Sequence, residues 1–409
     1  MKKRIAVIGS GISGLSASYY LRKKFHIQLF EQNDYLGGHT HTHALTLDSK
    51  NVNVDSGFIV FNNFNYQNFI KFIKELKVKY QISDMSFSVT SLKKKYEWSG
   101  KNLKTILSSQ NIFTLRYWRI LKDIFRFNKI TRQYIETNKI IDETVDIFLK
   151  KSKFTDEFIN LYFYPMCSSI WSNPIGEIKR YKIHFILSFF SNHGLINIFK
   201  KRPIWFTICN GSRTYVDKVK QAIGDDKIVL KKVIKINTKK KKIHTIDGSI
   251  YTYDHVILAT HTDDVKKILN YISKDQINVL NMVKYKKNIA TIHTDETIMP
   301  LKKANWSSWN FTEINKTFAL TYWMNLLQNL NTKINVFVSI NCENKIRKSK
   351  IIKKIVYKHP VFTSKIQDLQ EKLSKIQGYN NIWFVGAWQG YGFHEDGIKS
   401  SLRIIKQIK

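Results

Sequence analysis

Residues 4–14 read Arg-Ile-Ala-Val-Ile-Gly-Ser-Gly-Ile-Ser-Gly, and this stretch decides the fold. Residues 4–8 form a short run rich in β-branched side chains, which predicts a buried strand. Residues 13–24 follow with apolar side chains at helical spacing, and residues 27–30 predict a second strand. Strand, helix and strand together have the length of a βαβ unit. The chain is therefore predicted to begin with an α/β fold.

The glycines between the first strand and the helix predict a dinucleotide site. Gly9 permits the tight turn, Gly11 lets the backbone approach a pyrophosphate, and Gly14 lets the helix pack on the strand. The helix N-terminus offers free N–H groups to the phosphates. Glu31 ends the second strand, where its carboxylate would accept hydrogen bonds from ribose hydroxyls and repel a 2′-phosphate. A glycine-rich turn that binds nothing is the alternative. The predicted contacts are Gly9, Ser10, Gly11, Ile12, Ser13, Gly14, Glu31 and Gln32.

A second glycine pair indicates which dinucleotide is bound. Residues 36–40 read Leu-Gly-Gly-His-Thr, and a longer, extended cofactor needs one more close approach of the backbone. Here the sequence resembles the flavin-containing amine oxidoreductase superfamily, in which such a pair belongs to an FAD site. The resemblance narrows to a bacterial subgroup of FAD-dependent oxidoreductases, often encoded beside cyclopropane-fatty-acid-synthase-like genes. The matching stretches are 37–42, 54–62, 169–172, 210–215, 259–261, 306–310, 322–325, 386–388 and 390–397.

The resemblance implies further FAD contacts along the chain. Members often have Arg after the glycine pair, whereas this chain has His39. Residues 382–385 predict a strand, and a helix from about 397 to 408 would direct its N-terminus at the O2/N1 edge of the flavin. Asp396 has an alternative role as the N-cap of that helix. The implied contacts are Gly37, Gly38, His39, Thr40, Gly57, Val233 (through its backbone, to adenine), Gly386, Asp396, Gly397 and Ile398.

The predicted architecture is a Rossmann-type FAD-binding domain with an inserted, mixed α+β substrate-binding domain. The first would comprise residues 1–60, 205–265 and 380–409, and the second residues 61–204 and 266–379. Within these ranges, helices are predicted at 66–81 and 103–150, strands at 228–236, 256–259, 288–295 and 334–341, and a hairpin turn at 247–248.

The resemblance implies FAD-dependent oxidation, with hydride passing from a substrate C–H bond to flavin N5. The gene-neighbour association points to a lipid acyl chain, whose desaturation would be the reaction. An amine oxidase and a redox-neutral, flavin-dependent isomerase are the alternatives. His394 and Tyr322 are candidate catalytic residues, although either side chain could equally be structural. Aromatic walls for a dry pocket are expected from Trp171, Trp306, Trp309, Tyr322 and Trp323.

The net charge of +36, from 67 basic and 31 acidic residues, first suggests nucleic acid. Only 11 of the 67 basic residues are Arg, however, and the Lys residues are spread along the whole chain, so no nucleic-acid partner is expected. An apolar content of 43% excludes a disordered polycation. Residues 113–130 combine Arg116, Arg119, Lys122 and Arg126 with Trp118, which is compatible with peripheral contact to anionic lipid; a core-packed helix with a solvated face is the alternative.

Cysteine and histidine usage suggests a location and argues against a metal. The three cysteines, Cys167, Cys209 and Cys342, are widely spaced, which suits a reducing compartment. The expected location of the protein is therefore the cytoplasm, either free in it or bound peripherally to the inner face of the membrane. No run of about 18 apolar residues predicts a spanning helix. His39, His41 and His43 alternate, but no further ligand stands at a recognisable spacing, so no metal site is expected.

Overall fold

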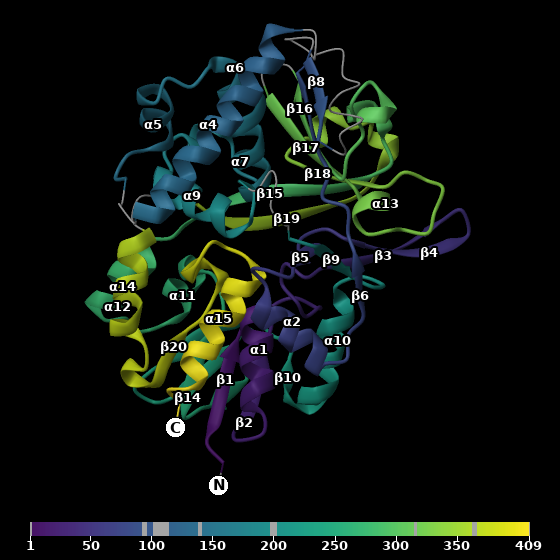
Figure 1. The fold of residues 1–409 in the computed structure, drawn as a ribbon. Helices are drawn as coiled ribbons and strands as arrows, with labels where there is room; N and C mark the ends of the chain where they lie inside the picture. Colours follow the sequence, from purple (N-terminus) through teal and green to yellow (C-terminus); the bar gives the residue numbers. More distant parts are fainter. Residues whose placement is uncertain are drawn as a thin grey trace.

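The computed structural model describes residues 2–91, 96–100, 114–137, 141–196, 203–314, 317–361 and 366–408. The chain forms two halves, and both termini lie in the half at the bottom of Figure 1. That half contains a five-stranded parallel sheet, and the other contains a seven-stranded mixed sheet flanked by helices (Figure 1).

The parallel sheet joins strands that are far apart in the sequence. Its order is β10 (Ile228–Val229), β2 (His26–Phe30), β1 (Arg4–Ile8), β14 (His255–Leu258) and β20 (Ile382–Phe384). Each of the three segments predicted to form the dinucleotide domain supplies at least one of these strands. The expected α/β fold class is confirmed, while the exact domain boundaries stay a prediction.

Alternating side chains on β1 anchor a layer on each face of this sheet. Ile5 and Val7 belong to one apolar cluster, and Ala6 and Ile8 belong to another. The first cluster includes residues of α1 (Ile12–Leu21), α2 (Gln67–Glu75), α10 (Arg213–Ile223) and α15 (His394–Ile405). The second includes residues of α11 (Thr262–Ile268), α12 (Lys274–Asn281), α14 (Ile366–Ile376) and the sheet of β11 (Val233–Asn237), β12 (Lys242–Thr245) and β13 (Ile250–Thr252).

The other half is built on the seven-stranded sheet. Its order is β19 (Ile351–Val361), β15 (Lys284–His293), β18 (Phe337–Ile340), β17 (Thr317–Trp323), β16 (Trp309–Ile314), β7 (Phe87–Ser91) and β8 (Tyr96–Ser99). The helices beside it are α4 (Leu115–Thr137), α5 (Val145–Lys151), α6 (Asp156–Phe158), the π-helix η2 (Ile159–Phe163), α7 (Tyr164–Trp171), α8 (Ile175–Ile178) and α9 (Ile183–Asn192). The small α13 (Met324–Leu327) follows β17.

Two further small sheets are present. β3 (Thr42–Leu47) and β4 (Lys50–Asp55) form a hairpin. β5 (Val60–Asn62) and β6 (Tyr80–Ile82) both pair with β9 (Trp205–Ile208).

Several predicted elements differ in the structure. The helix predicted at 66–81 ends at Glu75, because the chain turns at Lys77 with a positive φ of 55° and then enters β6. The strand predicted at 228–236 divides into β10 and β11, which belong to different sheets. Residues 103–150 are two helices, α4 and α5, where they are described; residues 101–113 and 138–140 lie outside the described part. The predicted turn at 247–248 does join β12 to β13.

No helix among the described residues is long and apolar enough to cross a membrane.

Candidate cofactor and substrate site

A cavity of about 1710 Å³ extends from the glycine loop into the half with the seven-stranded sheet. Its lining includes the turns that follow β1, β14 and β20, at the carboxyl ends of these parallel strands. Open α/β sheets bind their ligands at this edge. Sites for single small molecules typically measure about 300–1,000 Å³, so the cavity has room for more than one.

The glycine loop closes one end of the cavity. A Cβ on Gly14 would lie 1.9 Å from the carbonyl oxygen of Gly9, so the helix packs directly on the glycine loop. A Cβ on Gly11 would meet nothing within 4 Å and would project into open space. No side chain caps the N-terminus of α1, and Gly11, Ile12 and Ser13 line the cavity. Free N–H groups at the N-terminus of a ten-residue helix therefore face this space.

Glu31 lines the cavity and also fastens the glycine loop. Its Oε2 accepts hydrogen bonds from the Ser10 N–H at 3.0 Å and from the Ser10 hydroxyl at 2.6 Å. Its Oε1 accepts from the N–H of Asn33 at 3.0 Å and from the side-chain amide of Asn33 at 2.8 Å. The carboxylate predicted to hold a ribose is thus engaged with protein groups, a role that its position at the end of a strand did not reveal. Its contact with a ribose stays a prediction.

The second glycine pair lies directly against the first loop. Gly38 has a φ of +59°, and a Cβ on it would lie 3.2 Å from the Cα of Gly11. The N–H of Gly37 donates to the Ser10 carbonyl at 3.1 Å. A Cβ on Gly57 would lie 2.2 Å from the carbonyl oxygen of His39. The two predicted glycine stretches and Gly57 therefore form one continuous backbone surface at this end of the cavity.

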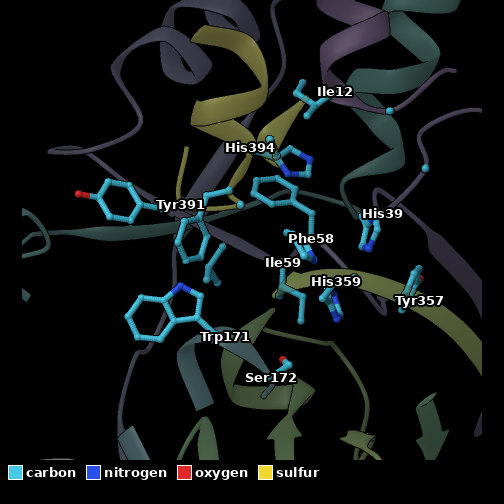
Figure 2. Close-up of a pocket in the computed structure, with 18 of the residues that line it drawn as sticks. Ile12, His39, Phe58, Ile59, Trp171, Ser172, Tyr357, His359, Tyr391 and His394 are labelled. Atoms are coloured by element: carbon cyan, nitrogen blue, oxygen red, sulfur yellow. The ribbon is translucent and has the colours of Figure 1, made fainter. Parts of the chain in front are cut away.

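His39 belongs to a group of rings on the cavity wall (Figure 2). Its ring stacks on Tyr357 at a centroid distance of 4.9 Å and lies 5.1 Å from His359 and 6.2 Å from His261. Burial and the neighbouring histidines hold the pKa of His39 well below its usual value, and burial lowers the pKa of His359 to about 4. These rings are therefore neutral near pH 7.

His394 lies at the start of α15, within the predicted site. Its ring stacks on Phe58 at a centroid distance of 3.5 Å (Figure 2), and its Nε2 is 2.9 Å from the Thr40 hydroxyl and 3.2 Å from the Tyr215 hydroxyl. Burial lowers the pKa of His394 to about 3, so the imidazole is neutral near pH 7. Thr40 thus fixes the His394 ring by a hydrogen bond. Thr40 itself is absent from the described cavity lining.

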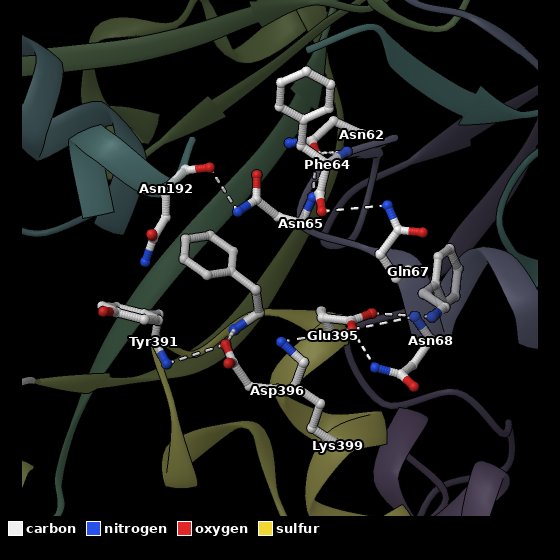
Figure 3. A network of polar contacts seen from close by, with 12 residues as sticks. Asn62, Phe64, Asn65, Gln67, Asn68, Asn192, Tyr391, Glu395, Asp396 and Lys399 are labelled. Atoms are coloured by element: carbon white, nitrogen blue, oxygen red, sulfur yellow. Dashed lines mark hydrogen bonds and ion pairs between the residues drawn. The ribbon is translucent and has the colours of Figure 1, made fainter. Parts of the chain in front are cut away.

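The start of α15 differs from the prediction. The helix begins at His394, about three residues before the expected start, so Asp396 is inside its first turn and is not the N-cap. The Asp396 carboxylate instead accepts hydrogen bonds from the N–H groups of Tyr391 and Phe393, each at 3.0 Å (Figure 3). A Cβ on Gly397 would lie 2.7 Å from the Ile12 side chain, so this glycine lets α15 pack on α1.

The substrate half of the cavity is mostly aromatic and aliphatic. Trp171 ends α7. Ser172 follows with a left-handed φ of 50°, a backbone conformation that few serines adopt. Burial raises the pKa of Tyr322, partly offset by its hydrogen bond with Ser172. Trp309 packs edge-on against Tyr322 at a centroid distance of 4.8 Å. The indole N–H groups of Trp171 and Trp309 have no hydrogen-bond partner among the described residues.

The lining includes most, but not all, of the predicted residues. Predicted residues in the lining are Gly9, Ser10, Gly11, Ile12, Ser13, Glu31, Gln32, Gly37, Gly38, His39, Gly57, Val233, Gly386, Tyr322 and His394. Predicted residues absent from the described lining are Gly14, Thr40, Asp396, Gly397 and Ile398. Ile398 is fully buried in the apolar cluster that covers one face of the parallel sheet. The roles of all these residues in binding and catalysis stay predictions.

Sequence reasoning about the aromatic walls was correct for some residues and missed others. Trp171, Trp309 and Tyr322 line the cavity, whereas Trp306 packs with Trp323 and Phe337 in a separate cluster. The ring-bearing residues that were not anticipated as lining include Phe58, His261, Tyr357, His359, Tyr391 and Phe393. Four of them, Phe58, His261, Tyr391 and Phe393, stand inside stretches that matched the family, and their ring character was the available signal.

A cluster of metal-binding side chain types also occurs beside the cavity. His261, Asp263 and Asp264 bring one ligand atom each to within 4.8 Å of one another. Lys358 already pairs with Asp263 at 3.2 Å and with Asp264 at 3.8 Å. Its ammonium group therefore supplies positive charge to this cluster.

Comparisons with known proteins agree with this geometry. The sequence family described as an NAD(P)-binding Rossmann-like domain matches residues 7–76, and no curated protein matches the chain. Among solved structures, the CLA-producing fatty acid isomerase from P. acnes is 13% identical, with a TM-score of 0.69 over 99% of this chain and 98% of that one. Cyclohexylamine oxidase from Brevibacterium oxydans IH-35A is 11% identical, with a TM-score of 0.69 over 100% and 99%. Putrescine oxidase bound to putrescine is 12% identical, with a TM-score of 0.70 over 100% and 99%.

At these identities the similarity concerns the fold. The predicted resemblance is confirmed at that level: residues 7–76 match the NAD(P)-binding Rossmann-like domain, and the whole chain shares the overall fold of the fatty acid isomerase, cyclohexylamine oxidase and putrescine oxidase.

Proposed function

We propose that this protein binds FAD in the large cavity and is an FAD-dependent oxidoreductase. The observation that carries the proposal is the uncapped N-terminus of α1 at Gly11, where a Cβ would project into the cavity. Such a terminus is suited to a phosphate group. The adjoining surface of Gly37, Gly38 and Gly57 favours a cofactor longer than a mononucleotide, because it lengthens the part of the cavity wall where a ligand can approach the backbone closely.

The residues available to hold FAD follow the cavity from one end to the other. Gly11, Ile12 and Ser13 would bind the diphosphate through backbone N–H groups, and Glu31 lies where a ribose hydroxyl would donate to it. Val233 lines the same end and would contact adenine through its backbone. His39, Gly57 and Gly386 line the stretch toward the aromatic half, where the flavin would lie.

Bound FAD supplies a hydride acceptor. The chain supplies position and a dry environment: Phe58, Tyr391 and Trp171 line the cavity around its middle (Figure 2). His394 is neutral and fixed by Thr40, so it serves to hold the wall of the site and does not act as an imidazolium acid near pH 7. Tyr322 keeps its proton, because burial raises the pKa of its hydroxyl.

We further propose that the substrate is a lipid acyl chain that the enzyme dehydrogenates. The fold similarity to a fatty acid isomerase and the apolar lining around Met166, Ile170 and Leu195 support this choice. The indole N–H groups of Trp171 and Trp309, for which the described part of the chain offers no acceptor, are donors suited to a carbonyl or carboxyl oxygen of such a chain. Isomerisation of the acyl chain without net oxidation is the second candidate, and the same isomerase similarity favours it.

Amine oxidation is the weaker candidate, although cyclohexylamine oxidase and putrescine oxidase share the fold. An available carboxylate in the substrate half would favour a cationic amine. There Asp84 accepts hydrogen bonds from the Ser86 N–H at 2.8 Å and from the Ser308 hydroxyl at 2.7 Å. Both bonds end on Oδ1, so this oxygen of the carboxylate is already engaged in the fold.

The visible spectrum of the purified chain tests FAD binding, with a matched pair of variants. Gly11→Ala adds a methyl group that meets no protein atom but projects toward the phosphate position, so we expect FAD affinity to fall at least about tenfold with little loss of stability. Gly176→Ala is the control, because a Cβ there also meets nothing within 4 Å and α8 lies away from the glycine loop. Absence of flavin absorbance, or equal affinities in both variants, would contradict the proposal.

Anaerobic mixing with oleate distinguishes oxidation from isomerisation. Dehydrogenation leaves the flavin reduced, so its visible absorbance bleaches in proportion to product. Isomerisation changes the fatty acid while the absorbance returns to its starting value. Putrescine and cyclohexylamine are the comparison substrates, and bleaching by an amine alone would favour amine oxidation.

We also propose a cytoplasmic location. Cys167, Cys209 and Cys342 are all free thiols, and two of them are buried, which suits a reducing compartment.

A further inference from the structure

The helix α4 has two different sides, one toward the cavity and one toward solvent. Leu121, Ile124 and Asn128 line the cavity. On the solvent side, Leu115 is 77% exposed, Trp118 59% and Phe125 49%. At 3.6 residues per turn, these three follow one line along the helix, and Lys122 and Lys129 continue the same line. We call Leu115, Trp118, Lys122, Phe125 and Lys129 the outward face of α4.

The outward face combines apolar exposure with positive charge. Lys122 and Lys129 are exposed, and the only carboxylate between residues 115 and 133 belongs to Asp123. Asp123 is buried on another side of the helix, where it accepts a hydrogen bond from the Thr155 hydroxyl at 2.7 Å and pairs with Arg126 at 3.4 Å. The lysines of the face are therefore not neutralised by a carboxylate of their own helix.

The exposed apolar residues of α4 are not core residues, because other side chains of the helix pack it against the fold. Tyr117, Ile120 and Phe127 are 2%, 5% and 1% exposed, and they already supply the packing of the helix against the fold. Leu115, Trp118 and Phe125 are additional large apolar side chains, and about half or more of each stays exposed. Exposed aromatic residues interleaved with lysine are typical of helices that lie in the interface of an anionic bilayer.

We propose that the outward face of α4 docks on an anionic lipid surface, so that the cavity wall formed by the same helix lies next to the bilayer. The inference rests on the proposed function, because an acyl substrate would then enter the cavity from the membrane. Residues one turn apart connect the two sides: Trp118 precedes Leu121 by three positions, and Phe125 precedes Asn128 by three. Charge complementarity selects anionic over neutral lipid, since each Lys near such a surface adds to the binding free energy.

Co-sedimentation of the flavin-loaded full chain with vesicles tests this proposal. The vesicles contain phosphatidylcholine alone, or phosphatidylcholine and phosphatidylglycerol in equal amounts. We expect binding to the mixed vesicles only, and release at high NaCl, because salt screens exposed charges. The double variant Lys122→Glu with Lys129→Glu is expected to reduce the partition coefficient by about tenfold or more. Trp118→Ser with Phe125→Ser, which removes the apolar anchor, is expected to reduce it by a similar factor.

The matched control is Lys239→Glu with Lys240→Glu, in the exposed turn between β11 and β12. It changes the net charge by the same amount as the α4 charge variant and should leave binding near that of the unmodified chain. Equal losses in both charge variants would mean that the overall charge binds lipid, which overturns the proposal. A yellow protein that stays in the supernatant also overturns it, whereas a colourless protein overturns the proposed function itself. Flavin absorbance in each variant shows that the variant is folded.

Discussion

His394 is a buried residue whose charge state affects both the site and the stability of the fold. Burial lowers its pKa to about 3, so the folded state binds a proton far less readily than the unfolded chain, where the imidazole has its ordinary pKa of 6.5. The stability that the neutral imidazole contributes is therefore complete above about pH 6.5 and is lost as the pH falls toward 3. Burial acts oppositely on Asp396, since it raises the pKa of that carboxyl to about 6.

Replacing His394 by Gln should make stability less dependent on pH. In the unmodified chain, keeping His394 neutral at pH 5 costs about 2 kcal/mol relative to pH 7, because the unfolded imidazole gains a proton. His394→Gln lacks this titration and keeps a side chain able to hydrogen bond with Thr40. We expect urea unfolding of the variant to lose about 2 kcal/mol less between the two pH values.

The control for this measurement is His26→Gln, on an exposed residue at the start of β2. Its pH dependence should follow that of the unmodified chain. If His394→Gln shows the same pH dependence as the control, His394 is not held neutral in the folded state.

At the scale of elements, Glu395 connects α15 to α2 although the two helices are more than 300 residues apart. Its Oε1 accepts from the side-chain amide of Asn68 at 2.6 Å, and its Oε2 accepts from the N–H of Phe69 at 3.0 Å (Figure 3). The Glu395 carboxylate thus satisfies N–H groups in the first turn of α2, a role usually taken by a neighbouring side chain. Both helices pack on the parallel sheet in the same apolar cluster.

Removal of this carboxylate should loosen the contact between the two helices. Glu395→Ala leaves N–H groups of α2 unpaired in a buried place, so we expect the free energy of unfolding in urea to fall by about 1–2 kcal/mol. Lys399→Ala is the comparison, because Lys399 is 56% exposed and its contact with Glu395 is 3.7 Å long. That change should cost under about 1 kcal/mol. Similar losses in the two variants would show that Glu395 acts through the ion pair and does not cap α2.

The elements that the sequence predicted correctly are those whose causes are local. β1, α1 and β2 follow from apolar spacing and from glycines within 27 residues, and the turn at 247–248 follows from an Asp-Gly pair. The helix at 66–81 was too long, because Gln81 pairs with Thr207 in a distant strand, which local spacing does not reveal. The start of α15 was late for a similar reason, since the side chain of His394 is fixed by Thr40, 354 residues away.

In the candidate site, too, features with local causes were predictable and features that depend on distant segments were not. The positions of Gly11 and Glu31 in the cavity lining were predictable because the motif that contains them is contiguous, although the hydrogen bonds that Glu31 accepts from Ser10 and Asn33 were not. The wall formed by Tyr357 and His359 was missed, because β19 reaches the cavity only through its place at the edge of the seven-stranded sheet. Periodicity identifies which face of a strand is apolar but not which distant loop that face meets.

At the scale of the whole molecule, the two halves share packing across the cavity. Tyr391 and Phe393 belong to the segment between β20 and α15, yet they pack on the apolar cluster of the helical half. The ring of Tyr391 lies 5.0 Å from Phe185, and the ring of Phe393 lies 5.5 Å from Phe189. A ligand that stabilises the β20–α15 segment therefore stabilises the helices α4–α9 as well.

This coupling predicts one cooperative thermal transition that FAD moves as a unit. A ligand whose free concentration is about 100 times its Kd adds about 2.7 kcal/mol to the stability of the folded form that binds it. With an unfolding entropy of about 2.1 cal/mol/K per residue, that amount raises the Tm of a 409-residue chain by about 3 °C. Calorimetry of the flavin-free chain, with and without added FAD, measures the shift.

Gly11→Ala should keep the starting Tm and show a smaller shift at the same FAD concentration, because it weakens binding without disturbing the core. A separate transition that FAD leaves unchanged would mean that the helical half unfolds independently, in conflict with the packing of Tyr391 and Phe393.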